Sequence, residues 1–343
     1  MSHSTSNPYI LDRPITKSSD FFGQEEILEQ CWEVGERTRY YAISGGPGSG
    51  KTSLLNRLQS RDAQHRSHPS VGNLRVCVAS AFIYLDCRLV PSAEAFMQQV
   101  ARLLIAQLPR SLADDSGCKA SGDMDDREFQ DLMESLPKKP VLLMDNIDAI
   151  TTHPGFSMDF FRYMRGLAID PGVSMITTSC QLLKDCFPPD PVCSDFWNIF
   201  TPVSLQPFTE EAMIALLTAQ GQRSGLSLLP YREEIEKLAG RIPFFVQLAS
   251  WHYFEALRDH AAPLSPAERE QVQRRVAHNA TPKLQRIWEN LSAEEKKAAR
   301  KIAQDGQVSG ENATIASLRK KGYICRDGLF SPLFTEYILN TGL

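Results

Sequence analysis

The stretch YYAISGGPGSGKTSLLNRL, residues 40–58, places glycines and other small turn residues between an apolar run and a helix-like run. Tyr40 to Ser44 is typical of a short strand, and the segment TSLLNRL is typical of a helix. Glycine weakens both neighbouring elements unless the backbone has to come very close to another group. The stretch therefore predicts a strand, a turn built for a close approach, and a helix.

The turn completes the pattern GxxxxGK[ST]. Glycines let successive backbone N–H groups turn inward around phosphate oxygens, at the positive end of the following helix. Lys51 is expected to reach the β- and γ-phosphates, and the Thr52 hydroxyl to ligate Mg²⁺. The expected cofactors are ATP or ADP and Mg²⁺. The expected nucleotide-binding residues are Gly45, Gly46, Pro47, Gly48, Ser49, Gly50, Lys51, Thr52 and Ser53.

A second motif, VLLMDNID at residues 141–148, supplies the acidic partner that such a loop needs for its metal. Asp145 ends an apolar strand and is the expected Walker B carboxylate, so Thr52 and Asp145 are the predicted metal ligands. The next residue is Asn146, whose amide has no useful basicity. Asp148 is the only nearby substitute carboxylate in this interpretation. The two motifs therefore favour nucleotide binding more strongly than fast hydrolysis.

The composition fits a globular protein of two or three domains, because the chain has 343 residues, of which 42% are hydrophobic. A formal charge of −4 excludes wholesale coating of nucleic acid. No apolar run approaches the length of a bilayer span, and the start MSHSTSNPYILDRP lacks the basic and apolar regions of a secretory signal. We therefore expect a cytoplasmic protein with no membrane contact.

Strands and helices alternate up to about residue 205, which predicts an α/β fold with a parallel sheet. Helices dominate beyond this point. The last stretch is typical of a helix, a short strand, a turn at Asp327-Gly328, a second strand and a helix, which is the order of a winged helix. The predicted domains are an extended arm (1–20), a P-loop ATPase core (21–205), a helical lid (206–282) and a winged-helix domain (283–343).

Several looser motifs then resemble one group of proteins. The segment FFGQEEI resembles the opening that precedes the P-loop in STAND-type ATPases and in archaeal origin-initiator relatives within the AAA+ class. LQPFTEEAMIALL is similar to the start of their helical lid, LAGRIPFFVQLAS to the lid's G-G-h-P motif, and LFSPLFTEYIL to their closing winged helix. The resemblance implies a switch in which core and lid clamp the nucleotide and the winged helix reports its state.

The resemblance also implies roles for single residues. Thr178 stands at the sensor-1 strand end, where a polar side chain would sense the γ-phosphate, and Pro243 would pack near the base or sugar; the alternative for Pro243 is a proline that only starts a helix. Gln24 stands where Arg is usual, Arg241 where a second Gly is usual, and Asn146 where Glu is usual. The expected catalytic set is Lys51, Asp145, Asn146, Asp148 and Thr178, with slow hydrolysis.

Two functions remain open. One is an ATP-gated signalling or scaffold switch that acts on an unknown protein partner, with a homo-oligomer in the ATP-bound state as one option. The alternative is a DNA-associated AAA+ ATPase of the initiator or transposition-regulator kind. Residues 283–343 hold ten Lys or Arg and seven Asp or Glu, and Arg319, Lys320 and Lys321 end the expected recognition helix. The same cations also suit a helix C-terminus that faces solvent.

Overall fold

A computed structural model of the chain describes residues 6–35, 38–60, 81–107, 125–136, 139–188, 195–258 and 263–341. Its main sheet has five parallel strands in the order β2-β3-β4-β1-β5. The strands are β1 (Tyr40–Ser44), β2 (Phe82–Asp86), β3 (Val141–Asp145), β4 (Ser174–Ser179) and β5 (Thr201–Ser204). The predicted α/β fold with a parallel sheet is confirmed.

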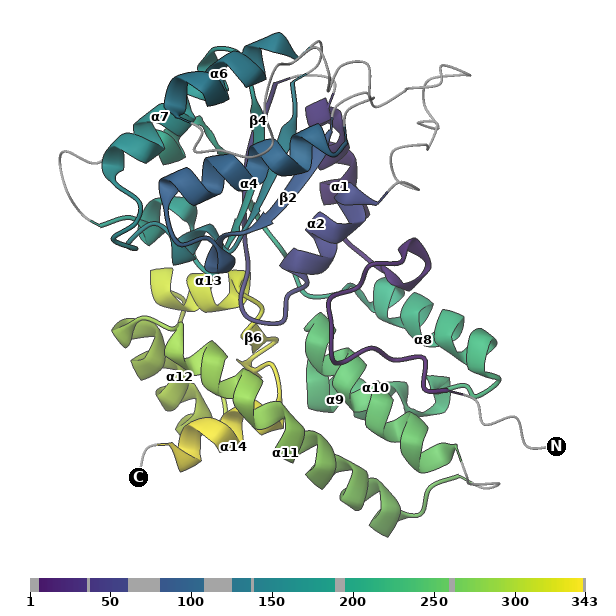
Figure 1. Ribbon diagram of the computed structural model, residues 1–343. Helices are drawn as coiled ribbons and strands as arrows, with labels where there is room; N and C mark the ends of the chain where they lie inside the picture. The colour runs from purple at the N-terminus through teal and green to yellow at the C-terminus, as the bar shows by residue number, and fades with distance from the viewer. Residues whose placement is uncertain are drawn as a thin grey trace.

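Helices cover both faces of this sheet (Figure 1). They are α1 (Glu25–Trp32), α2 (Lys51–Gln59), α4 (Ala93–Ile105), α6 (Asp126–Ser135) and α7 (Met158–Ile169). Side chains alternate between the faces along each strand. In β3, Leu143 packs with α1 and α2, whereas Leu142 and Met144 pack with α4, α6 and α7. The sheet is therefore the middle of three layers, with polar groups of β2, β3 and β4 at its carboxyl edge.

One strand escaped sequence analysis. β5 pairs with β1 alone, contains Pro202, and has no alternation of buried apolar side chains. Proline cannot donate to a ladder, so it is tolerated at the edge of a sheet. The strand is therefore recognised by its pairing and not by its pattern.

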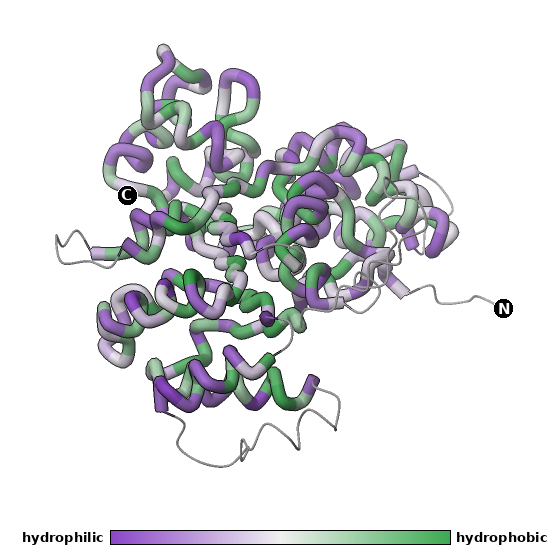
Figure 2. The backbone as a smooth tube through the Cα atoms, turned by 90° about the horizontal axis from the view of Figure 1, so that it is seen from above, coloured by the Kyte–Doolittle hydropathy of each residue, from purple (hydrophilic) through white to green (hydrophobic). Residues whose placement is uncertain are grey.

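The rest of the described chain is helical apart from one short hairpin (Figure 1). It contains the lid helices α8 (Glu210–Ser224), α9 (Arg232–Ala239) and α10 (Pro243–Leu257), then α11 (Pro266–Glu289), and then what we call the C-terminal unit: α12 (Ala293–Asp305), α13 (Ala313–Lys320), β6 (Ile324–Cys325), β7 (Gly328–Leu329) and α14 (Pro332–Asn340). Figure 2 shows hydrophobic and hydrophilic residues interspersed along the backbone. α11 and α12 each bury one face, whereas ten of the 15 residues of α10 are buried.

A single hydrophobic core joins the lid helices, α11 and the C-terminal unit. α11 runs without a break through residues 282 and 283, where the sequence placed a domain boundary, and it carries Pro282 in its interior. A proline inside a helix removes one backbone hydrogen bond and permits a bend.

The hairpin of the C-terminal unit turns one residue earlier than predicted. Cys325 pairs with Gly328, so the turn is Arg326-Asp327 and not Asp327-Gly328. Arg326 has a positive φ of 54°. Gly328 lies in the strand instead, where its backbone groups pair with β6.

Candidate nucleotide-binding site

The loop between β1 and α2 has the backbone that its glycines predict. Gly48 and Gly50 have φ angles of 89° and 97°, in the left-handed region that favours glycine. Lys51 is the first residue of α2, and its Nζ donates to the carbonyl oxygens of Gly45 (2.5 Å) and Gly46 (3.3 Å). The ammonium is therefore folded over the loop, beside the backbone N–H groups that would face phosphates.

Asp145 is fully buried and collects three hydroxyl groups. Its Oδ2 accepts from Thr52 Oγ1 at 2.7 Å and from the hydroxyl of Tyr84 at 3.0 Å, and its Oδ1 accepts from Thr178 Oγ1. The structure thus brings the two predicted metal ligands, Thr52 and Asp145, into direct contact. Tyr84 was missed by sequence analysis; its place in β2, paired in register with β3, brings it there.

Thr178, for which the resemblance implies a sensor-1 role, lies beside Asp145 near the end of β4. Its side chain is completely buried, donates to Asp145 and accepts from the backbone N of Asn146 at 3.0 Å. It therefore orients Asp145 and Asn146, while Cys180, two positions on, lines the cavity.

Asn146 and Asp148 occupy the turn that follows β3. Asn146 has a φ of 55°, a conformation that Asn adopts more readily than Glu. Its Nδ2 donates to Asp86 Oδ1 at 3.2 Å. Asp148 turns towards β4 instead, where its Oδ2 accepts from Cys180 N at 3.4 Å. The prediction that Asp148 is the only nearby substitute carboxylate is therefore wrong, because Asp86 contacts Asn146 directly.

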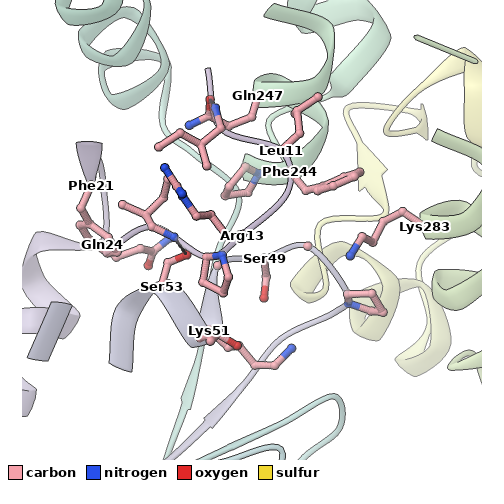
Figure 3. Close-up of a pocket in the computed structure, with 18 of the residues that line it drawn as sticks. Leu11, Arg13, Phe21, Gln24, Ser49, Lys51, Ser53, Phe244, Gln247 and Lys283 are labelled. Atoms are coloured by element: carbon pink, nitrogen blue, oxygen red, sulfur yellow. Dashed lines mark hydrogen bonds between the residues drawn. The ribbon is translucent and has the colours of Figure 1, made fainter. Parts of the chain in front are cut away.

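A cavity of about 350 Å³ opens above the loop (Figure 3). One wall is the segment of residues 10–15, which the sequence placed in an extended arm. This segment is tied down at both ends, because Ile10 N donates to Gln247 Oε1 at 3.3 Å and Ile15 N donates to Ser53 Oγ at 3.0 Å. The arm therefore closes the cavity between α10 and α2. A volume of this size suits a small-molecule ligand.

The lid forms a second wall and touches the loop directly. Pro243 starts α10 and lines the cavity, and its packing against a base or sugar stays a prediction. The next residue, Phe244, donates its backbone N–H to Gly48 O at 3.1 Å. A Cβ on Gly48 would lie 2.9 Å from Phe244 Cβ. A side chain at position 48 would therefore clash with the lid, and glycine permits this close contact between the lid and the loop.

Two residues that depart from the family pattern have other contacts. Gln24 lies at the start of α1 with a φ of 65°, and its Nε2 donates to Gln206 O at 2.7 Å. Arg241 pairs with Glu236 at 2.8 Å and with Glu210 at 3.8 Å. Gln24 therefore links the core to the start of the lid, and Arg241 links two helices of the lid to each other.

Four cations at the cavity were not predicted from the sequence: Arg13 in the N-terminal segment, Arg88 after β2, and Lys283 and Arg286 on α11. Lys283 Nζ lies 4.5 Å from the centre of the Phe244 ring (Figure 3). Burial lowers the pKa of Lys283, and the charges of Arg286 and Lys51 lower it further. Together with Lys51, these side chains make the cavity attractive to a polyanion. The spacing of three residues between Lys283 and Arg286, which puts both on one face of a helix, was the available signal.

A parallel sheet with a phosphate-binding loop after its first strand, a buried aspartate after its third and a helical lid over the cavity defines a P-loop NTPase of the AAA+ class. Comparison with known families agrees. The family model described as Novel STAND NTPase 2 matches residues 124–309, and a model described as AAA domain matches residues 35–187. The first match covers more than half of the chain, and the chain belongs to the Novel STAND NTPase 2 family.

One solved structure shows the same fold. The ORC2 protein of Aeropyrum pernix, in ADPNP-ADP complexes, is 12% identical with a TM-score of 0.57, and the match covers 98% of this chain and 96% of that one. A STAND protein with a tetratricopeptide repeat sensor from Pyrococcus horikoshii is 14% identical with a TM-score of 0.38, over 94% of this chain and 42% of that one. No curated protein matches the sequence. Within the described ranges, no helix has the length and apolarity needed to cross a membrane.

Proposed function

We propose that this protein is an ATP-binding molecular switch whose slow, Mg²⁺-dependent hydrolysis gates assembly with, or signalling to, a protein partner. The observation that carries the proposal is a direct contact between the C-terminal unit and the phosphate-binding loop. Tyr323 lies between α13 and β6, and a Cβ added to Gly46 would overlap its hydroxyl group. A loop that adjusts around phosphates would therefore move against the C-terminal unit.

A second glycine supports this docking. Gly322 has a φ of 75°, and a Cβ there would overlap Pro207, in the segment that leads from β5 to the lid. Tyr323 itself is almost completely buried and packs with Phe330 and Phe334. The contact is thus made by a rigid part of the C-terminal unit, as a reporter of the loop requires.

The helix α11 is a second structural connection between the nucleotide-binding cavity and the C-terminal unit. It carries Lys283 and Arg286 into the cavity and continues directly into α12. Cations in a cavity shielded from water attract phosphate more strongly than they do in solvent. A nucleotide with one more phosphate would therefore pull this helix differently from its diphosphate.

Magnesium fits the oxygens at the foot of the cavity. A hydroxyl and a carboxylate oxygen 2.7 Å apart, those of Thr52 and Asp145, are hard donors of the kind that Mg²⁺ prefers. These two residues would hold the ion, which neutralises charge on the phosphates. Asn146 cannot accept a proton, and a missing general base lowers rates by about two to four powers of ten. Slow basal turnover follows.

The DNA-binding alternative has less support. Arg319 pairs with Glu311 at 3.5 Å and donates to Arg326 O, and Lys321 pairs with the buried Glu295 at 2.6 Å. Two of the three expected phosphate contacts are thus engaged inside the C-terminal unit. Its element order still allows a winged helix that contacts protein. Salt-sensitive binding of duplex DNA by the wild type would restore the alternative.

The test measures nucleotide binding together with the movement of the C-terminal unit relative to the core. Spin labels at Cys325, which is exposed, and at an introduced Asp159→Cys on α7 would measure the distance between C-terminal unit and core, with other accessible cysteines replaced by serine. We expect ATP and ADP to give different distance distributions, and Lys51→Ala to abolish ATP binding and the difference together. Identical distributions with both nucleotides would contradict the switch, and undiminished ATP binding by a folded Lys51→Ala would contradict the P-loop assignment.

A further inference from the structure

A carboxylate stands beside Asn146 on the neighbouring strand. β2 and β3 are parallel and in register, so that Asp86 pairs with Asp145 at the carboxyl edge of the sheet. Asp86 therefore lies next to the residue that follows Asp145 in the chain. Asp86 could not be assigned to the site from the sequence, because it lies 59 positions before Asp145 and nothing in the pattern shows which strands are neighbours.

Asp86 is held firmly in place. Its Oδ1 accepts from Asn146 Nδ2 at 3.2 Å and from Arg88 N at 3.1 Å, and Arg88 Nη2 donates to Oδ2 at 2.6 Å. Its side chain is 13% exposed. Burial acts to raise the pKa of Asp86, but the hydrogen bonds and charge of Arg88 and the bond from Asn146 outweigh it, so the pKa is lowered. The side chain is an anion at neutral pH.

An ionised carboxylate can only accept hydrogen bonds, and this decides how the amide of Asn146 lies. The nitrogen must face Asp86, so the oxygen Oδ1 is the group that Asn146 can offer to the cavity it lines. Without the carboxylate, nitrogen and oxygen could exchange places at little cost, and the amide would then present a donor in half of its orientations. A water that attacks phosphorus has to be held by an acceptor, which leaves its lone pair free.

We propose that Asp86 is a positioning residue for ATP hydrolysis, which fixes Asn146 as an acceptor for the attacking water and so takes over part of the task of the acid that is absent at position 146. The inference rests on the proposed hydrolysis. The water oxygen forms a bond to the terminal phosphorus, the bond to the bridging oxygen breaks with its electron pair left on ADP, and the water proton passes to the phosphate product. Asp86 acts throughout by way of Asn146.

The local backbone explains why a glutamate, the acid usual at this position, does not stand at position 146. A left-handed conformation costs most residues free energy, whereas Asn and Asp adopt it by bonding locally. Asp148 offers no equivalent, because it faces Cys180 on the side of β4. The register of β2 against β3 places a carboxylate near the site without this cost.

The experiment first removes the carboxylate at position 86 and then restores a carboxylate at position 146. Asp86→Asn should lower kcat for phosphate release at least about tenfold, while the Kd for ATP changes less than about threefold. The double variant Asp86→Asn/Asn146→Asp returns a carboxylate to the pair in a residue that tolerates the left-handed backbone. It should recover most of the lost rate, which a merely structural loss would not. Asp305→Asn, an exposed aspartate on α12, is the matched control and should leave kcat unchanged.

The outcomes distinguish a failure of the role proposed for Asp86 from a failure of the proposed ATP hydrolysis. An unchanged kcat in Asp86→Asn, or a double variant no faster than Asp86→Asn although both bind ATP, overturns the role of Asp86 alone. Wild-type phosphate release no faster than that of Lys51→Ala removes hydrolysis from the proposed function and this inference with it. Thermal melting of each variant shows whether a lost rate reflects a lost fold.

Discussion

Asp145 shows at the scale of single residues how an aspartate is prepared for a metal. Its three hydroxyl donors come from α2, β2 and β4, so the position of the carboxylate depends on three separate elements. Burial raises the pKa of Tyr84, and the negative charge of Asp145 raises it further, so Tyr84 remains a donor at any physiological pH. A donor that cannot ionise is a dependable support for a metal ligand.

Removing the Tyr84 hydroxyl should therefore weaken magnesium binding. Loss of an outer hydrogen bond to a metal ligand typically costs about ten- to a hundredfold in metal affinity. We expect Tyr84→Phe to raise the Mg²⁺ concentration needed for half-maximal hydrolysis about tenfold, with ATP binding nearly unchanged. The matched control is Tyr40→Phe, whose hydroxyl bonds to Ala168 O away from the cavity. Equal Mg²⁺ requirements in both variants would contradict a supporting role for Tyr84.

At the scale of elements, the lid helix α10 and the helix α11 enclose a histidine. His252 is buried, and its Nε2 lies 2.9 Å from Nδ2 of Asn279. Burial lowers the pKa of His252, and the nearby Arg275 lowers it further. The folded protein thus favours the neutral ring, whereas the unfolded chain takes up a proton near the ordinary value of 6.5.

The stability of the lid should consequently be greatest above about pH 6.5 and fall as the pH drops through this value towards the lowered pKa. Thermal melting between pH 7.5 and 5.5 measures the effect. We expect His252→Gln to flatten this dependence, while His278→Gln, on the exposed side of α11, leaves it as in the wild type. The same slope in all three proteins would show that another group is responsible.

The elements also show what could be predicted from the sequence. β1, α2 and β3 are recognisable because a glycine pattern and an unbroken apolar run leave few alternatives. Ser92 is likewise a recognisable helix N-cap, and it caps α4 by accepting from Ala95 N at 3.3 Å. Asp86, Tyr84 and Lys283 could not be assigned, because their roles arise from the order of strands and the docking of α11. Local patterns do not encode which distant segments meet.

At the scale of the whole molecule, the core, the lid and the C-terminal unit meet at one loop. Phe244 touches it at Gly48, and Tyr323 touches it at Gly46. Each contact requires the absence of a side chain on the loop. The loop is therefore shared between the ligand and two other parts of the chain, which is what coupling between them demands.

Adding one methyl group should separate the C-terminal unit from the loop. A Cβ in Gly46→Ala overlaps the Tyr323 hydroxyl and comes within 2.8 Å of Cζ, so in the absence of nucleotide the distance between spin labels at positions 325 and 159 should change. Tyr323→Leu removes both atoms, and the double variant should return towards the wild-type distance. A distance unaffected by Gly46→Ala would show that the contact yields without moving the C-terminal unit.

The long helix α11 has one more consequence, which is mechanical. Lys283 stands 17 residues from its first residue, or about 26 Å at 1.5 Å per residue, and Pro282 lies immediately beside it. Because proline removes one backbone hydrogen bond, α11 bends more easily here, at the point where phosphates would attract the Lys283 ammonium. A bend of about 10° there would sweep the far tip of the helix through roughly 4 Å. The helix is in this sense a lever with its short arm in the cavity and its long arm towards Pro266, where a small rotation beside Lys283 becomes a displacement of several ångströms.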